Sequence, residues 1–245
     1  MAKRPGALED LVTPAFWKDR RVFVTGHTGF KGAWLVALLR HLGAQVTGYA
    51  LDPPTEPSLF AMAKTASRVK DLRGDICDAD ALLQAMKNAR ADIVLHMAAQ
   101  SLVRFSFASP FETWRVNVMG TVNVLEAARA CAPNVVIIVT TDKVYDQRGQ
   151  QRPFVEEDPL GGHDPYSSSK AAAEIATAAW RDNYLALPVV VASARAGNVI
   201  GGGDYAADRI VPDAVRAFSK RKVLEVRSPF SIRPGSMCSS PCLAI

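Results

Sequence analysis

The sequence predicts an α/β fold, a doubly wound parallel sheet of the Rossmann type. Short apolar segments that do not alternate with polar residues recur along the chain, and segments with helical periodicity separate them. Strands that are apolar on both faces are typical of a parallel sheet with helices on both sides. Right-handed crossovers then favour the strand order 3-2-1-4-5-6.

The first half of the chain alternates strand and helix. A strand is expected at Arg21–Thr25 (RVFVT), and the amphipathic segment Phe30–Leu42 is expected as the helix after it. A second strand at Gln45–Ala50 ends where the prolines of DPPTEP forbid its continuation. A weaker strand at Val69–Arg73 follows, and then a short helix at Asp78–Asn88, whose first residue can cap it.

The second half repeats this alternation with longer helices. The segment NVVIIV is apolar throughout and predicts a fully buried strand, whereas the Ala-rich KAAAEIATAAW predicts a helix. The elements expected here are strand Asp92–Met97, helix Phe111–Cys131, strand Val135–Thr140, helix Tyr166–Tyr184, strand Val189–Ser193 and helix Ile210–Lys220.

Composition narrows the class of protein. The chain has 245 residues, 49% of them hydrophobic, and a net charge of +5 without a dense Lys/Arg block. We therefore expect an enzyme for a phosphorylated substrate and no nucleic-acid partner. No apolar run approaches the ~18 residues of a membrane span, and the N-terminus lacks the apolar core of a signal peptide. A cytoplasmic protein without a membrane contact is expected.

The cysteines and histidines do not predict a metal site. Cys238 and Cys242 form a lone C-x3-C without a second ligand pair, and the four histidines are scattered. The other cysteines, Cys77 and Cys131, are isolated and are expected to be reduced. Metal chemistry is therefore not predicted.

A Gly-rich turn follows the first strand directly. Glycines at this position allow a tight turn and let the backbone approach a pyrophosphate, while the next helix offers unpaired N–H groups. The alternative is a Gly-rich turn without a ligand. We interpret the turn as a dinucleotide site. Its residues are Gly26, His27, Thr28, Gly29, Phe30, Lys31 and Gly32.

Three residues after the second and third strands are candidates for the adenosine half of that ligand. Asp52 stands where a carboxylate would bind the adenine ribose, which favours NAD over NADP because a carboxylate repels the extra phosphate. A plain turn aspartate before Pro53 is the alternative. Asp75 and Ile76 are expected to line the adenine.

The candidate reacting centre lies after the fifth strand. Tyr166 and Lys170 form Tyr-x-x-x-Lys at a helix start, which places both side chains on one face. Thr141 and Asp142 end the fifth strand, and ligands gather at the carboxyl ends of such strands. The alternative is a helix start with a solvated lysine. A tyrosine base near neutral pH needs its pKa of ~10 lowered by about 3 units, which adjacent positive charge favours.

These motifs, with Asn117 in RVNVMGTVNVLEA, resemble the extended short-chain dehydrogenase/reductases. Within them the chain resembles the CDP-glucose 4,6-dehydratases through GYALDPPTEPSLF, HMAAQSLVR, DPYSSSKAAAE and ARAGNVIGGGD. The resemblance covers nearly all of residues 16–234. It implies NAD as cofactor, CDP-glucose as substrate, a homodimer, and an active-site role for Asn117. It also implies cofactor contacts by Ala98, Ala99 and Gln100.

The resemblance also implies a mechanism. Tyr166 would take the proton of the sugar 4-hydroxyl, and Thr141 would hydrogen-bond the same oxygen. Asp142 matches the family's acid, and Lys143 stands where related dehydratases often carry glutamate. Adjacent groups titrate together, so the separate roles of the two stay open.

Substrate contacts are expected from the segment after the sixth strand. Arg195, Asn198 and the glycines of GNVIGGGD match the segment that meets the nucleotide diphosphate, and Arg can grip phosphate oxygens with two N–H groups. Arg209 is a further candidate for substrate binding. A structural arginine in a Gly-rich turn is the alternative. The chain departs from the family at Ser101 and Phe105, where Pro and Arg are expected, and in VYDQRGQQRP.

The expected domains are an N-terminal extension (1–15), an NAD-binding domain (16–200), the start of a substrate lobe (201–234) and an aberrant tail (235–245). The family continues with WQHVLEPLSGY where this chain reads GSMCSSPCLAI, and one set of codons encodes both in adjacent frames. We therefore expect a one-nucleotide frameshift that left the C-terminal substrate lobe largely missing. Rival functions are another nucleotide-sugar 4,6-dehydratase, a 4-epimerase, or an inactive NAD-binding remnant. The helices from Phe111 and Tyr166 could pair in a dimer or only cover the sheet.

Overall fold

A parallel six-stranded sheet forms the centre of the molecule. The computed structural model describes residues 13–147, 152–185, 188–226, 229–230 and 235–237. The strand order is β3-β2-β1-β4-β5-β6, as predicted. The strands are β1 (Arg21–Thr25), β2 (Gln45–Ala50), β3 (Lys70–Arg73), β4 (Ile93–His96), β5 (Val135–Thr141) and β6 (Val190–Ala196). A separate two-stranded parallel ladder joins β7 (Asn198–Ile200) to β8 (Gly235–Met237).

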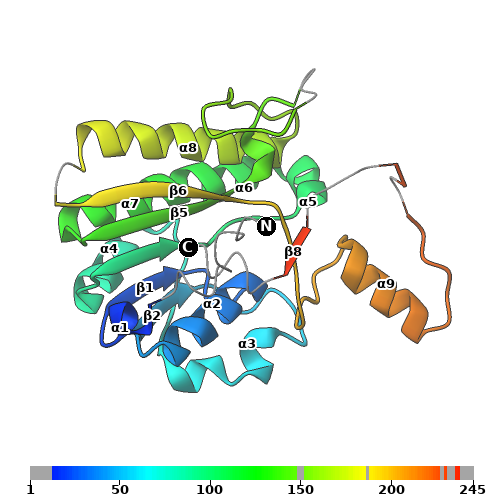
Figure 1. Cartoon of the computed structure of the whole chain (residues 1–245), viewed down its shortest axis with the longest axis horizontal. Helices are drawn as coiled ribbons and strands as arrows, with labels where there is room; N and C mark the ends of the chain where they lie inside the picture. The colour runs from blue at the N-terminus through cyan, green and yellow to red at the C-terminus, as the bar shows by residue number, and fades with distance from the viewer. Residues whose placement is uncertain (1–12, 148–151, 186–187, 227–228, 231–234, 238–245) are drawn as a thin grey trace, which may run out of the picture.

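Helices cover both faces of this sheet (Figure 1). The α-helices are α1 (Pro14–Trp17), α2 (Phe30–His41), α3 (Leu59–Met62), α4 (Ala79–Ala89), α5 (Val103–Ala108), α6 (Pro110–Trp114), α7 (Gly120–Cys131), α8 (Pro165–Asn183) and α9 (Ile210–Ser219). Shorter helical turns are η2 (Thr65–Arg68), η3 (Arg115–Met119) and η4 (Asp142–Val144). Helix α9 stands beside the layers in Figure 1, and no residue of it is buried.

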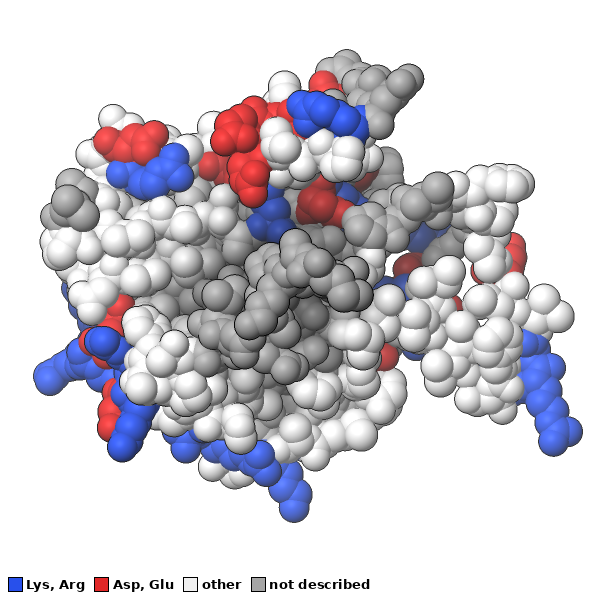
Figure 2. Space-filling view, in the orientation of Figure 1, with Lys and Arg blue, Asp and Glu red and all other residues white. Residues whose placement is uncertain are grey.

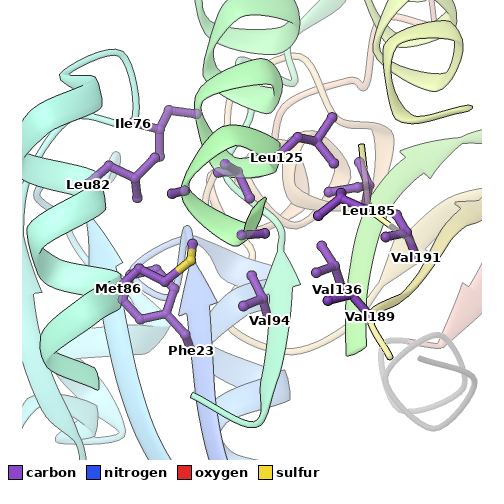
Figure 3. Packing of buried hydrophobic residues seen from close by; sticks show 14 of the residues in the cluster. Phe23, Ile76, Leu82, Met86, Val94, Leu125, Val136, Leu185, Val189 and Val191 are labelled. Carbon is purple, nitrogen blue, oxygen red and sulfur yellow. The ribbon is translucent and has the colours of Figure 1, made fainter. Parts of the chain in front are cut away.

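The apolar core is divided by the sheet into two clusters. On one face, Phe23 and Val94 pack against Leu82 and Met86 of α4 and Leu125 of α7 (Figure 3). On the other face, the cluster contains residues of β1, β2, β4 and α2 and of the turn between α2 and β2: Val22, Val24, Leu35, Val36, Leu39, Ala44, Val46, Ile93 and Leu95. Alternate residues of a strand face opposite sides, so unalternating apolar strands supply both clusters.

Several predicted boundaries change where tertiary contacts intervene. The strand expected at Asp92–Met97 is one residue shorter at each end, and the Asp92 carboxylate accepts the backbone N–H of Arg21 at 3.0 Å. The long helix expected at Phe111–Cys131 contains a π-helical turn, η3, between α6 and α7. The sixth strand continues three residues beyond the expected Ser193 because Ala194, Arg195 and Ala196 pair with β5.

The C-terminal segment is described only in part. Most of the expected tail, with Cys238 and Cys242, lies outside the described residues, but Gly235–Met237 forms β8. On the face shown in Figure 2, the Lys and Arg side chains stand apart around the rim and alternate with acidic ones. Across the described ranges, no helix is both long enough and apolar enough to cross a membrane.

Candidate active site

The Gly-rich turn after β1 is closed by backbone contacts that leave no space for side chains. Gly26 has φ +73°, and a Cβ there would lie 2.6 Å from the Ala98 nitrogen after β4. A Cβ on Gly32 would lie 2.1 Å from the Gly26 carbonyl oxygen. Gly29 is the N-cap of α2 and provides no side-chain cap for the first N–H groups of that helix. The turn therefore has the shape and the free donors that a dinucleotide pyrophosphate requires.

Two side chains of this turn point toward the protein interior. The His27 ring is fully buried, contacts Gly48 of β2, and bonds Asp71 through Nε2 at 2.8 Å. Burial lowers the pKa of His27, and the Asp71 carboxylate opposes that shift. Thr28 donates its hydroxyl to the Leu51 carbonyl at 2.9 Å. Both side chains hold the turn against β2, so any ligand contact by these two residues would come from the backbone.

The residues predicted for the adenosine half lie at the ends of β2 and β3. Asp52 is exposed and lies 3.7 Å from the Arg73 guanidinium. The Asp75 carboxylate accepts the Cys77 N–H at 2.9 Å and an Arg115 N–H at 3.2 Å. Burial is the largest single effect on the pKa of Asp75 and raises it, but the contacts with Cys77 and Arg115 together outweigh burial, so the pKa is lowered. Ile76 is buried against Gly120.

Tyr166 and Lys170 are both buried near the start of α8. Lys170 Nζ donates to the Val139 carbonyl of β5 at 2.9 Å. Burial and then the charge of Lys31 lower the pKa of Lys170 to about 8. Burial raises the pKa of Tyr166 to about 12; the hydrogen bond with Thr141 opposes this and the Asp142 charge adds to it. The alternative of a solvated lysine at this position is therefore wrong.

Helix α8 meets the end of β5, which brings the predicted reacting groups together. The Thr141 hydroxyl donates to Asp142 Oδ1 at 3.0 Å and contacts the Tyr166 phenol. Lys143 Nζ lies 3.5 Å from Asn198 Oδ1 on β7. The Tyr166 phenol, the Thr141 hydroxyl, the Asp142 carboxylate and the Lys143 ammonium thus lie along one strand end and the facing helix.

Asn117 makes bonds that hold other residues in place. Its Oδ1 accepts the Gln100 N–H at 2.9 Å, while its Nδ2 donates to the Gln100 carbonyl at 3.0 Å and to Ser169 Oγ at 2.9 Å. The side chain is completely buried in the π-helical turn. Asn117 therefore connects the loop after β4, which contains Ala98 and Ala99, to the helix of Tyr166.

The Arg195 guanidinium makes several contacts within the protein. Its Nε and Nη2 donate to the two carboxylate oxygens of Glu174 at 2.9 and 2.8 Å, and Nη1 donates to the Glu156 carbonyl. The guanidinium also lies 4.8 Å from the ring centroid of Tyr145. These contacts give Arg195 a structural role between β6 and α8. The predicted phosphate contact would have to displace one of these partners.

Arg209 remains near the reacting groups. It bonds Asp204 Oδ2 at 2.9 Å and lies 3.5 Å from Ser101 Oγ, and its charge lowers the pKa of Tyr166. Sequence reasoning missed Glu174 and Asp204, the carboxylates that hold the two arginines. A signal existed only for Glu174, which follows Lys170 by one helical turn on the same face.

No group of three or more His, Cys, Asp or Glu side chains that could hold a metal ion occurs among the residues the structure describes. A pocket of about 450 Å³ lies at the opposite end of the sheet, lined by residues that include Arg21, Arg90 and Asn134. It is remote from the motifs above.

The chain is similar in sequence to NAD dependent epimerases and dehydratases. The sequence model of the NAD dependent epimerase/dehydratase family matches residues 22–233. The chain is 46% identical over 231 residues to a CDP-glucose 4,6-dehydratase of Salmonella typhimurium, covering 91% of this chain and 64% of the relative. It is 34% identical over 196 residues to a human dTDP-D-glucose 4,6-dehydratase, covering 79% of this chain and 55% of that protein.

A solved structure has the same arrangement. The double mutant of a dTDP-glucose 4,6-dehydratase from Streptomyces venezuelae, with NAD and DAU bound, superposes with a TM-score of 0.80 at 25% identity. The match covers 91% of this chain and 69% of that one. The chain thus spans between about half and two thirds of the length of the curated relatives described here.

Proposed function

Because this chain belongs to the NAD-dependent epimerase/dehydratase family, we propose that it is a CDP-glucose 4,6-dehydratase that forms CDP-4-keto-6-deoxyglucose. One observation carries the proposal: at the carboxyl edge of the sheet the Thr141 hydroxyl bonds the Asp142 carboxylate and contacts the Tyr166 phenol, and the Asp142 charge acts on that phenol. The 46% identity to a CDP-glucose 4,6-dehydratase supports the choice of substrate.

The turn Gly26–Gly32 would hold the pyrophosphate of NAD, and Asp52, Asp75 and Ile76 would hold its adenosine. The loop residues Ala98, Ala99 and Gln100 would line the other half. When bound, NAD supplies a hydride acceptor for sugar C4, a hydride donor for C6 and a positive charge near the phenol. The residues that receive it are preorganised, because the backbone of Ala98 already packs against Gly26.

Tyr166 would accept the proton of the 4-hydroxyl, with Thr141 hydrogen-bonded to the same oxygen. Without NAD, burial raises the pKa of Tyr166 to about 12, so the phenol carries its proton and needs the positive charge of the bound cofactor before it can act as the base. Asp142 contributes to that high value, and Arg209 opposes it.

Asp142 and Lys143 would carry out the loss of water after C4 is oxidised. The ketone acidifies the C5 proton, which Lys143 would remove as a neutral amine while Asp142 protonates the departing 6-hydroxyl. The bond to Asn198 orients the ammonium group of Lys143. An epimerase has no need for this pair, because it neither removes the C5 proton nor expels the 6-hydroxyl.

Incubation of the protein with CDP-, dTDP-, GDP- and UDP-glucose in D₂O tests the proposal. We expect a 4-keto-6-deoxy product from CDP-glucose, with deuterium at C5 detected by NMR. The matched control is Tyr166→Phe, which removes only the phenolic oxygen. A product epimerised at C4 without deuterium at C5 would identify a 4-epimerase. Binding of NAD without conversion of any of the four sugars would identify a cofactor-binding remnant.

The state of assembly and the location of the protein are also proposals. Phe111, Trp114 and Met119 of the α6–η3 segment and Ile175 of α8 are exposed apolar residues that a homodimer would cover. Sedimentation at micromolar concentration tests the dimer; a monomer there would refute it. Cell fractionation tests the cytoplasmic location, and recovery with membranes would refute it.

A further inference from the structure

A buried hydrogen-bonded layer lies between the apolar core and the Gly-rich turn, and the proposed reaction does not use it. Its members are Thr25, His96, Thr121 and Asn117, all at most 1% exposed. Thr25 and His96 are register partners on β1 and β4, two residues after Phe23 and Val94 of the apolar cluster in Figure 3. Residues two apart on a strand share a face, so this polar layer directly covers the core.

Each hydrogen bond of this layer has a defined donor and acceptor. Thr25 Oγ1 accepts the N–H groups of Met97 at 3.1 Å and Ala98 at 3.2 Å. Its one proton is therefore directed to His96 Nδ1, at 2.7 Å. At the other end, Thr121 Oγ1 donates to the Asn117 carbonyl at 2.7 Å, so it accepts a proton from His96 Nε2 at 3.1 Å.

These directions assign both the charge and the tautomer of the ring. Nδ1 must be an acceptor and Nε2 must carry the proton, because a neutral imidazole has one of each. A second ring proton would face the Thr25 oxygen, which already accepts two N–H groups. Burial, and then the charge of Lys170 on α8, lower the pKa of His96 to about 3, which agrees with a neutral ring.

The layer connects the cofactor turn to the reacting tyrosine. Ala98, whose N–H donates to Thr25, is the residue that packs against Gly26. At the other end, the Asn117 side chain bonds Ser169, which donates to the Tyr166 carbonyl at 2.7 Å.

We propose that His96 is a positioning residue: as the neutral Nε2–H tautomer it fixes the strand ends that form the cofactor turn to the π-helical segment that carries Asn117. Only the identity of the ligand in that turn, NAD, rests on the proposed function. Loss of the connection weakens the hold on the Ala98 backbone and therefore weakens binding at the turn.

The substitution Thr121→Val tests this role, because it removes the acceptor for His96 Nε2 and keeps the side-chain shape. Thr121→Ser restores the hydroxyl and is expected to rescue the effect. Thr177→Val is the matched control. Thr177 is equally buried and donates to the Ala173 carbonyl at 2.7 Å, the same bond to the preceding turn, without contacting a histidine.

Two measurements need no ligand. Imidazole ¹⁵N NMR of the wild type should show one ring as a neutral Nε2–H tautomer from about pH 5 to 8, a signal that His96→Gln removes. Hydrogen exchange at the Ala98 amide should be roughly ten-fold faster in Thr121→Val than in the wild type, and unchanged in the other two threonine variants. Calorimetry should show an NAD dissociation constant raised by about ten-fold in Thr121→Val alone.

A charged ring, or one protonated on Nδ1, overturns the proposal whatever the variants do. Equal changes in Ala98 exchange for Thr121→Val and Thr177→Val also overturn it, because the effect would then be loss of a helix bond. Failure of the wild type to bind NAD refutes the proposed cofactor, whereas the tautomer and the exchange rates still decide the role of His96. The wild-type spectrum decides it even where a variant does not fold.

Discussion

The substitution Arg195→Met distinguishes a structural arginine from a phosphate ligand. It removes two hydrogen bonds to Glu174, one to the Glu156 carbonyl, and the contact with the Tyr145 ring. The Glu174 side chain is 5% exposed and, within the described part of the chain, would keep the hydroxyls of Thr140 and Ser193 as its donors.

Removal of one partner from a buried ion pair typically costs about 3 to 5 kcal/mol. The Arg195 side chain is 19% exposed, so water can reach Glu174 after the change and the lower value applies, about 3 kcal/mol. For a chain of this size, such a loss lowers Tm by roughly 6 to 12 °C. The companion change Glu174→Gln should give a coupling energy of at least about 1 kcal/mol in a double-mutant cycle.

Urea unfolding followed by circular dichroism measures these free energies. The control is Arg129→Met, which breaks an ion pair with Glu126 whose partners are 54% and 42% exposed, and which should destabilise the protein much less than Arg195→Met. The reasoning fails if Arg195→Met is no more destabilising than this control. Loss of CDP-glucose binding with unchanged stability would restore Arg195 as a substrate residue.

Three further changes give separate expectations. Gly32→Ala should lower the free energy of unfolding by about 1 to 3 kcal/mol or abolish NAD binding, because its Cβ would lie 2.1 Å from a carbonyl oxygen. The control is Gly202→Ala, whose Cβ would meet nothing within 4 Å. Equal stability and equal NAD binding of the two variants in calorimetry would contradict this expectation. Tyr166→Phe should lower kcat by roughly 10²–10⁴-fold and leave the NAD dissociation constant within a few-fold, and an active variant would exclude the phenol as base. Burial lowers the pKa of Lys170 from 10.5 to about 8, so between these pH values the unfolded chain binds more protons than the folded protein. The stability of the wild type relative to Lys170→Met should therefore rise with pH from about 8 to 10.5. A stability difference that does not change with pH in urea titrations would contradict the buried cation.

The motifs at the ends of strands could be located without coordinates. Strand order followed from apolar segments and handedness rules, and in such a sheet the carboxyl ends of β1, β4 and β5 share one edge. That places Gly26, Ala98 and Thr141 near each other. The helical spacing of Tyr166 and Lys170 placed both on the face that meets β5.

The π-helical turn, in contrast, has no counterpart in the hydrophobic pattern. Residues 111–131 read as one amphipathic helix, yet the segment has to present Asn117 to Gln100 and Ser169 at once. Those partners come from residues 17 and 52 positions away. Local helix propensity does not depend on contacts with residues so distant in the chain.

The sequence by itself determined the fold class, the glycine turn and the candidate reacting residues, because these depend on periodicity and on short fixed spacings. Only the tertiary structure decided which polar groups face one another in the interior. It paired Arg195 with Glu174, buried His27 against β2, and placed His96 between two threonines. The physical reason is that the partner of a buried polar group depends on packing between distant segments, while its residue type specifies only the bonds it must make.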